Sequence, residues 1–218
     1  MGFIPLYVYF VAVSFIASLL IYQKPNPYYG YLKIFPFFLL ATFLAEFYGS
    51  YLSSQGENNV ALYNFFTVFE FFFYQILISL IVNNRRIKMI MQICSLIYVL
   101  IATANILFFQ GLNTFHTITY SLACLIIVGF CVYYFWELFK FPKSIKLTRT
   151  PAFWICSGLL FFYCCSFPLY GFLNVWSNVP IIVKNFMEIV TILNIFLYST
   201  FTIAFLCVKT RKYTSSSL

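Results

Sequence analysis

Aspartate is absent from this chain of 218 residues, and histidine occurs only once, as His116. A zinc site of three histidines therefore cannot form, and chemistry that needs two aspartates is excluded. Charged residues make up 8% of the chain, whereas a soluble domain has about 25%. This scarcity of charge excludes an ordinary soluble domain.

Cys-x-x-Cys pairs are also missing, although the chain has seven cysteines. All seven lie within apolar stretches, which predicts small buried side chains and neither a disulfide framework nor a metal site. No lysine or arginine precedes the first apolar stretch. A cleaved signal peptide begins with a basic region, so we expect this stretch to be retained as a membrane span.

Apolar residues are abundant and make up 63% of the chain. A helix needs about 20 of them to cross the hydrocarbon core of a bilayer. Seven segments are long enough, and the short gaps between them leave no chain for a soluble domain. We therefore predict an all-α, polytopic membrane protein in which residues 1–218 form one seven-helix bundle, with spans at 3–22, 32–52, 63–82, 89–109, 117–139, 152–173 and 181–208.

Twelve of the thirteen lysines and arginines lie in every second gap between these spans and in the tail 209–218. Cytoplasmic loops keep an excess of positive charge, so this alternation predicts an N-terminus outside and a C-terminus inside, with a basic cytoplasmic tail. The same rule accounts for the net charge of +8 through contact with the lipid bilayer. We therefore expect no nucleic-acid partner.

Three of the five glutamates lie inside predicted spans. Glu46, Glu70 and Glu188 are each six or seven residues from the outer end of their span, or roughly 10 Å below the outer surface. Charge at this depth costs a few kcal/mol unless it is paired or hydrated. The pattern predicts an acidic pocket open to the outside. The alternative is that Glu188 pairs with Lys184, while Glu46 and Glu70 only bond neighbouring tyrosines and asparagines.

Other polar residues at similar depth complete the predicted pocket, for a small polar or cationic ligand. We expect it to contain Glu46, Glu70, Tyr74, Asn105, His116, Lys184, Glu188 and Asn194. We predict no metal or other cofactor there. The two remaining glutamates are expected at the surface, Glu57 in solvent and Glu137 in an ion pair with Lys140.

Two segments of the chain carry a resemblance to known proteins: residues 61–67, Ala-Leu-Tyr-Asn-Phe-Phe-Thr, and residues 151–158, Pro-Ala-Phe-Trp-Ile-Cys-Ser-Gly. In these segments the chain resembles small seven-span membrane proteins that are common in Bacteroidetes and have no assigned activity. This similarity implies a bacterial cytoplasmic (inner) membrane location and no mechanism.

A weak internal repeat carries a second resemblance. Tyr48-Gly49, Asn59-Val60 and Glu70 correspond in order to Tyr170-Gly171, Asn178-Val179 and Glu188. The layout of three spans, one linker span and three spans resembles the small sugar carriers of the SWEET type, which implies a binding site between the repeats. The Pro-Gln dipeptide of relatives of these carriers is missing.

Other seven-helix families are excluded by single residues. Retinal proteins need a lysine near the middle of the last span, where this chain has Asn194. Hydrolases of the ceramidase and adiponectin-receptor type need three histidines, and the lysoplasmalogenase family relies on paired aspartates.

The pattern as a whole favours a carrier of protons, or of a small cationic or polyhydroxyl ligand, with Glu70 and Glu188 as its central groups. A sensor or receptor is the second interpretation; it would signal to a protein partner through the basic cytoplasmic loops. An intramembrane enzyme acting on lipid or quinone through a glutamate, and a pore-forming assembly, are the lesser alternatives.

Overall fold

The computed structural model describes residues 4–23, 27–140, 147–171 and 180–208, without the side chains of 27, 28 and 180–184. Regular structure within these ranges is entirely helical. Seven helical segments of the described chain are long and apolar enough to cross a membrane: Leu6–Gln23, Tyr29–Ser54, Val60–Ile81, Arg85–Gln110, Thr117–Lys140, Pro151–Gly171 and Asn185–Leu206. Each coincides with one predicted span, so the prediction of an all-α bundle of seven such helices is confirmed.

Several segments contain more than one helical element. The first is α1 (Leu6–Ser18) with α2 (Leu20–Gln23), the second η1 (Pro27–Ile34) with α3 (Phe35–Ser54), and the fourth α5 (Arg85–Ala104) with the π-helical η2 (Asn105–Gln110). The others are α4 (Val60–Ile81), α6 (Thr117–Lys140), α7 (Pro151–Gly171), preceded by η3 (Leu147–Arg149), and α9 (Pro180–Leu206).

Local sequence accounts for some of these ends. The Asn84 side chain accepts hydrogen bonds from the backbone N–H groups of Arg86 and Ile87, at 3.0 and 3.3 Å, and so caps the start of α5. Gly111 follows η2 with a φ of 80°, a conformation that suits glycine and ends the helix.

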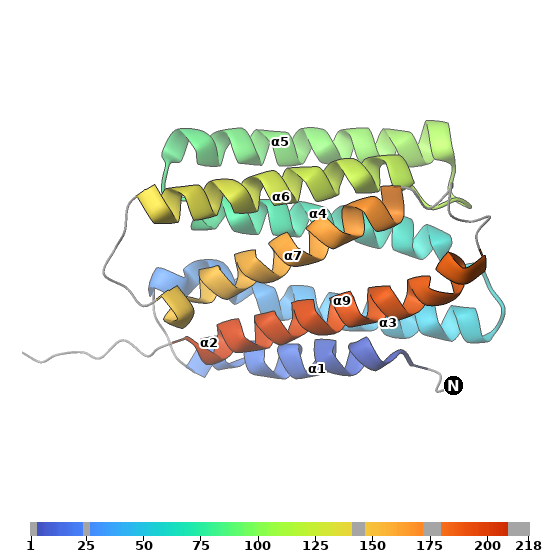
Figure 1. Ribbon diagram of the computed structural model, residues 1–218, viewed down its shortest axis with the longest axis horizontal. Coiled ribbons are helices and arrows are strands. Elements are labelled where there is room, and N and C mark those ends of the chain that lie inside the picture. The colour runs from blue at the N-terminus through green and yellow to red at the C-terminus, as the bar shows by residue number, and fades with distance from the viewer. Residues whose placement is uncertain (1–3, 24–26, 141–146, 172–179, 209–218) are drawn as a thin grey trace, which may run out of the picture.

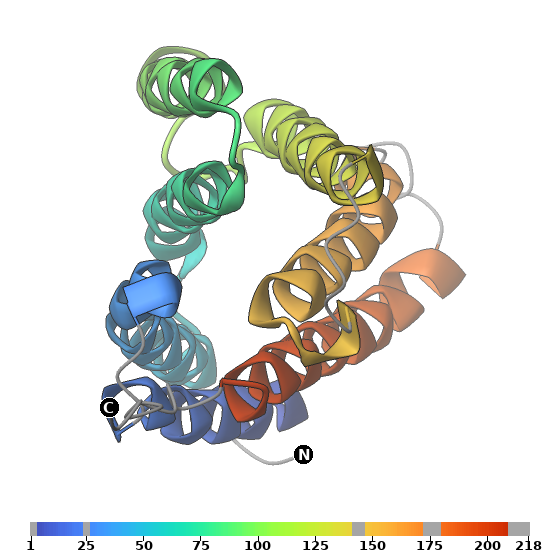
Figure 2. The same cartoon turned by 90° about the vertical axis from the view of Figure 1, so that its left-hand side faces the viewer.

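Six of the spans form a closed ring. Around it, α1 packs on α3, α3 on α4, α4 on α6, α6 on α7, α7 on α9, and α9 again on α1. Helix α5 lies outside the ring against α4 and α6, as the end-on view shows (Figure 2). The ring therefore joins the first three spans to the last three, and the fourth span is peripheral.

The two ends of the bundle differ in charge. Because successive spans run in opposite directions (Figure 1), one end collects every lysine and arginine whose side chain the structure describes. These are Lys33, Arg85, Arg86, Lys88, Lys140 and Arg149. We call this the basic end. The opposite end, where α1, α4, α6 and α9 begin, is called the cavity end.

An aromatic core fills the ring in the half nearer the basic end. Phe35 of α3 is fully buried, and its ring centroid lies 5.3 Å from that of Phe73 in α4. The Phe35 ring also lies 5.1 Å from Phe201 and 5.2 Å from Phe205 of α9. Because α3, α4 and α9 come from different parts of the ring, these contacts close its middle.

Glu137 corrects one prediction of the sequence. It is buried at 8% exposure, and its carboxylate accepts the backbone N–H groups of Asn83 and Asn84, at 2.9 and 3.0 Å. The side chain thus binds the α4–α5 connection to the end of α6 and does not lie at the surface. The Lys140 ammonium lies over the Trp136 ring, 4.6 Å from its centroid.

Candidate functional site

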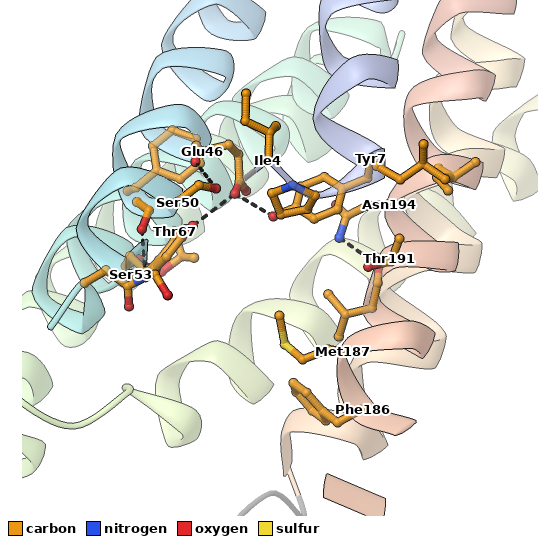
Figure 3. A pocket seen from close by; sticks show the side chains of 18 of the residues that line it. Ile4, Tyr7, Glu46, Ser50, Ser53, Thr67, Phe186, Met187, Thr191 and Asn194 are labelled. Carbon is orange, nitrogen blue, oxygen red and sulfur yellow. Dashed lines mark hydrogen bonds between the residues drawn. The ribbon is translucent and has the colours of Figure 1, made fainter. Parts of the chain in front are cut away.

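A cavity of about 1320 Å³ occupies the ring in the half nearer the cavity end. Its walls come from α1, α3, α4, α6, α7 and α9, that is, from every member of the ring. The exposed residues Ser53 and Ser54 at the end of α3 belong to its lining, so the cavity reaches the surface of the protein. Figure 3 shows Glu46 and Ser50 of α3 on one side and Met187, Thr191 and Asn194 of α9 on the other.

Glu46, Glu70 and Glu188 all line this cavity. They project from the consecutive helices α3 and α4 and from α9, at the other end of the chain, and these three helices meet around the cavity only in the folded ring. The structure thus brings together the three glutamates that the sequence places at one depth.

Glu46 is held by two phenol groups. The hydroxyl of Tyr7, from α1, donates to its Oε2 at 2.6 Å, and the hydroxyl of Tyr63, from α4, donates to the same oxygen at 3.1 Å. One carboxyl group therefore ties three consecutive helices of the ring together at the cavity wall. These two bonds are the kind of tyrosine partnership that the structural alternative for Glu46 predicts.

Glu70 has surroundings of another kind. Its carboxyl group lies within electrostatic reach of Glu46 and of the Tyr74 hydroxyl, one helical turn further along α4, and this hydroxyl is buried without a hydrogen-bond partner among the described residues. No cation is among these partners in the described part of the chain. The hydroxyls of Tyr98 and Tyr163, also within electrostatic reach, are buried and have no hydrogen-bond partner among the described residues.

The other predicted pocket residues of α9 lie in the same wall. Glu188 is exposed along the cavity. Asn194, two turns further, also lines it, and its amide donates to the Val190 carbonyl at 2.9 Å. The side chain of Lys184 lies outside the described part of the structure, and so does the predicted pair between Lys184 and Glu188.

Asn105 and His116 do not line the cavity, although they lie at its level. The His116 ring is fully buried, with Nε2 2.6 Å from the Thr67 hydroxyl and Nδ1 2.9 Å from the Thr119 hydroxyl. The Asn105 amide donates to Gln110 at 2.6 Å. His116 thus fastens the start of α6 to α4, whereas Asn105 bonds within η2 and donates to Thr119 of α6 at 3.3 Å.

Burial has an electrostatic consequence for His116, which precedes the first residue of α6. Removal from water disfavours the charged imidazolium, and this lowers the pKa of His116 from 6.5 to about 4. The ring is therefore neutral near pH 7 and accepts or donates hydrogen bonds as a neutral imidazole.

Tyr74 lies beneath the cavity and not in its wall. It is fully buried, and its ring packs against Phe38, Tyr163 and Phe201, at centroid distances of 5.1, 6.1 and 5.9 Å. The structure therefore places Tyr74 one helical turn from Glu70, outside the described lining of the cavity.

Sequence reasoning missed the aromatic part of the lining. Ten aromatic side chains line the cavity: Tyr7, Tyr9, Tyr63, Phe66, Phe115, Tyr120, Phe162, Tyr170, Phe186 and Tyr198. Helical spacing offered one signal, because Tyr63 is two turns before Glu70 and so shares its face of α4. The high frequency of phenylalanine and tyrosine along the whole chain hides the others.

Among the described residues, no three His, Cys, Asp or Glu side chains lie close enough together to hold one metal ion. The described chain is thus a bundle of seven helices long and apolar enough to cross a membrane, six of which form a ring with an acidic and aromatic chamber at one end. No protein-family model, curated protein or solved structure matches this chain.

Proposed function

We propose that this protein is an integral membrane protein of the bacterial cytoplasmic membrane that carries a small polar or cationic ligand, or protons. The observation that supports this most is the cavity lined by Glu46, Glu70 and Glu188. Carboxylates within membrane spans are rare and costly, and they mark ligand and ion pathways.

The orientation follows from charge. The described lysines and arginines at the basic end belong to the cytoplasmic side under the positive-inside rule. The cavity end then faces the outside, with the N-terminus, and the C-terminal tail is cytoplasmic. A ligand would enter from the outside and meet the three glutamates within about two turns of helix.

A sensor is the second candidate, and one feature of the fold favours it. The aromatic core around Phe35 fills the ring between the cavity and the basic end. A carrier must open a path through this core, whereas a sensor needs no second exit. The sensor would pass its state to a protein partner at the basic loops. The filled core gives no support to a permanently open pore.

Reconstitution separates the two candidates. Purified protein in liposomes would be tested for counterflow of labelled ammonium compounds, polyols and monosaccharides, and for proton uptake by a pH-sensitive dye trapped inside. We expect saturable movement of at least one of these that falls strongly in Glu70→Gln. Glu57→Gln is the matched control, because Glu57 is exposed in the α3–α4 connection and does not line the cavity.

Movement no faster than in empty liposomes, for every solute and for protons, would reject the carrier. Movement that is equal in the wild type and in Glu70→Gln would reject the role of the cavity.

A further inference from the structure

One side of the cavity carries two of the three glutamates, and the other side carries Glu188 and a chain of aromatic rings. Glu46 and Glu70 lie on the side formed by α3 and α4. On the side formed by α6, α7 and α9, four rings touch in sequence: the ring centroids of Phe115 and Tyr120 are 5.3 Å apart, those of Tyr120 and Tyr170 4.3 Å, and those of Tyr170 and Phe186 5.3 Å. We call these four residues the aromatic wall.

Several hydrogen-bond donors in the lining are already used within the protein. The engaged donors are the side chains of Tyr7, Ser50, Ser54, Asn59, Tyr63, Thr67 and Asn194. What the described lining offers a ligand is therefore carboxylate oxygen and aromatic faces, together with hydroxyl groups such as those of Thr191 and Tyr198. A sugar has acceptor oxygens that need protein donors, whereas a cation brings donors or charge and needs none.

Positive charge is also attracted by the rings around Glu70. Six tyrosines lie within electrostatic reach of its carboxyl group: Tyr74, Tyr98, Tyr120, Tyr163, Tyr170 and Tyr198. A cation near an aromatic face is stabilised by the negative potential of the ring, and more so where water is excluded. Tyr120, Tyr170 and Tyr198 line the cavity themselves.

Size and spacing favour a molecule over an atomic ion. The three glutamates do not converge into a metal-binding group among the described residues. The cavity volume of about 1320 Å³ exceeds the range of about 300–1,000 Å³ that is usual for small-molecule pockets.

We propose that the cavity binds a monovalent organic cation with an apolar body. The cationic centre lies at Glu70 among the tyrosine rings, and the apolar body packs on the aromatic wall (Figure 3 shows the Phe186 end of this wall). This cation site rests on the proposed function only because both take the cavity as the ligand site. Binding of the cation does not require that the protein transports it.

Tetraphenylphosphonium and tetraphenylborate test the proposal, because they have the same shape and opposite charge. Binding would be measured by equilibrium dialysis with the protein in lipid nanodiscs, and with empty nanodiscs as the blank. We expect the cation to bind to the wild type at least about tenfold more tightly than the anion, after subtraction of the blank. Equal affinity for the two ions would overturn the proposal, and this comparison needs no variant.

Two pairs of variants locate the site. Glu70→Gln is expected to weaken tetraphenylphosphonium binding about tenfold, and Glu57→Gln to leave it unchanged. Tyr198→Leu removes an aromatic face and should lose about threefold or more, whereas Tyr48→Leu, at an exposed ring that does not line the cavity, should leave the affinity unchanged. Unchanged binding in both Glu70→Gln and Tyr198→Leu would place the cation outside the cavity and reject the site.

The binding experiment tests the cation site and the counterflow experiment tests the carrier, so either proposal can be rejected without the other. Charge-selective binding without counterflow rejects the carrier and keeps the cation site, as a sensor requires. Counterflow of a polyol or of protons, with equal binding of the two tetraphenyl ions, keeps the carrier and rejects the cation site.

Discussion

Glu46 and Glu70 line the same cavity, yet their contacts give them different tasks. Glu46 accepts hydrogen bonds from two tyrosines of neighbouring helices, and these bonds join α1, α3 and α4. Glu70 is surrounded by phenol rings and by the Glu46 carboxyl group, with no cation among its described partners. We infer that Glu46 organises the wall, whereas Glu70 remains available to a ligand.

Replacement of Glu46 tests its structural task. In Glu46→Ala the Tyr7 and Tyr63 hydroxyls lose their acceptor, so we expect the free energy of unfolding to fall by about 1–3 kcal/mol. Thermal unfolding of purified protein in detergent measures this change. Glu57→Ala, in the exposed connection, should unfold within about 0.5 kcal/mol of the wild type. Equal melting of the two variants would contradict a structural role for Glu46.

His116 predicts a dependence of stability on pH. Its pKa is about 4 in the folded protein and about 6.5 when unfolded, so the unfolded chain binds more protons between these values. Stability is therefore intact above about pH 6.5 and falls as the pH drops to about 4, by about 3 kcal/mol from this residue.

His116→Gln should lack this component of the pH dependence. The test is the difference in melting temperature between the wild type and the variant, measured from pH 7.5 to pH 4.5 in buffers of equal ionic strength. The wild type should lose stability faster as the pH falls. Parallel curves would show that His116 is not buried as a neutral ring.

At the scale of helices, the close approach of α7 and α9 depends on one glycine. A Cβ atom at Gly158 would clash with the Oγ1 of Thr200, whose hydroxyl donates to the Leu197 carbonyl at 2.7 Å. The contact is part of the ring that encloses the cavity. Any larger residue at position 158 must therefore push α9 outward or displace Thr200.

Gly158→Ala should destabilise the protein by about 1–3 kcal/mol, the cost of overpacking a close helix contact. Gly129→Ala is the matched control, because an added Cβ there meets nothing within 4 Å, and alanine favours the helix by about 1 kcal/mol. Thermal unfolding compares the two. The atom nearest to a Cβ at position 158 is the hydroxyl oxygen of Thr200. Adding Thr200→Ser to Gly158→Ala keeps this hydroxyl and should recover little of the lost stability. Adding Thr200→Ala removes the hydroxyl and should recover more.

At the scale of the whole molecule, the separation of charge from the cavity is the main organising feature. The described basic side chains and the acidic chamber lie at opposite ends of the bundle. Under the proposed topology these ends lie on opposite sides of the membrane, with the cavity exposed to the outside.

Labelling of introduced cysteines in intact cells tests this orientation. Gln55→Cys, exposed between α3 and α4, should react with a membrane-impermeant maleimide added outside. Arg86→Cys, exposed at the basic end, should react only after the cells are permeabilised. Because native cysteines lie in or near the spans, the parent chain provides the background. The reverse pattern would invert the proposed topology.

Much of the architecture could be predicted from the sequence, because a span is recognised by the length of its apolar run, which needs no tertiary information. The length of an apolar run does not show how a helix is rotated about its axis or where the connections between helices lie. His116 and Asn105 are at the right depth, but His116 belongs to the α5–α6 connection and the Asn105 amide bonds Gln110 of its own helix, η2. Glu137 is a charged residue of the kind usually found at the surface, but its carboxylate accepts two backbone N–H groups of the α4–α5 connection, which is distant in sequence.

The sequence by itself determined seven apolar helices, their alternating charge and the shared depth of three glutamates, since each of these is a property of position along the chain. Only the tertiary structure decided that Glu46 would bind Tyr7 and Tyr63 while Glu70 lies among tyrosines, and that an aromatic wall would complete the chamber. The physical reason is that these contacts join side chains of different helices. Their partners depend on how each helix is rotated and on which helices the ring makes neighbours.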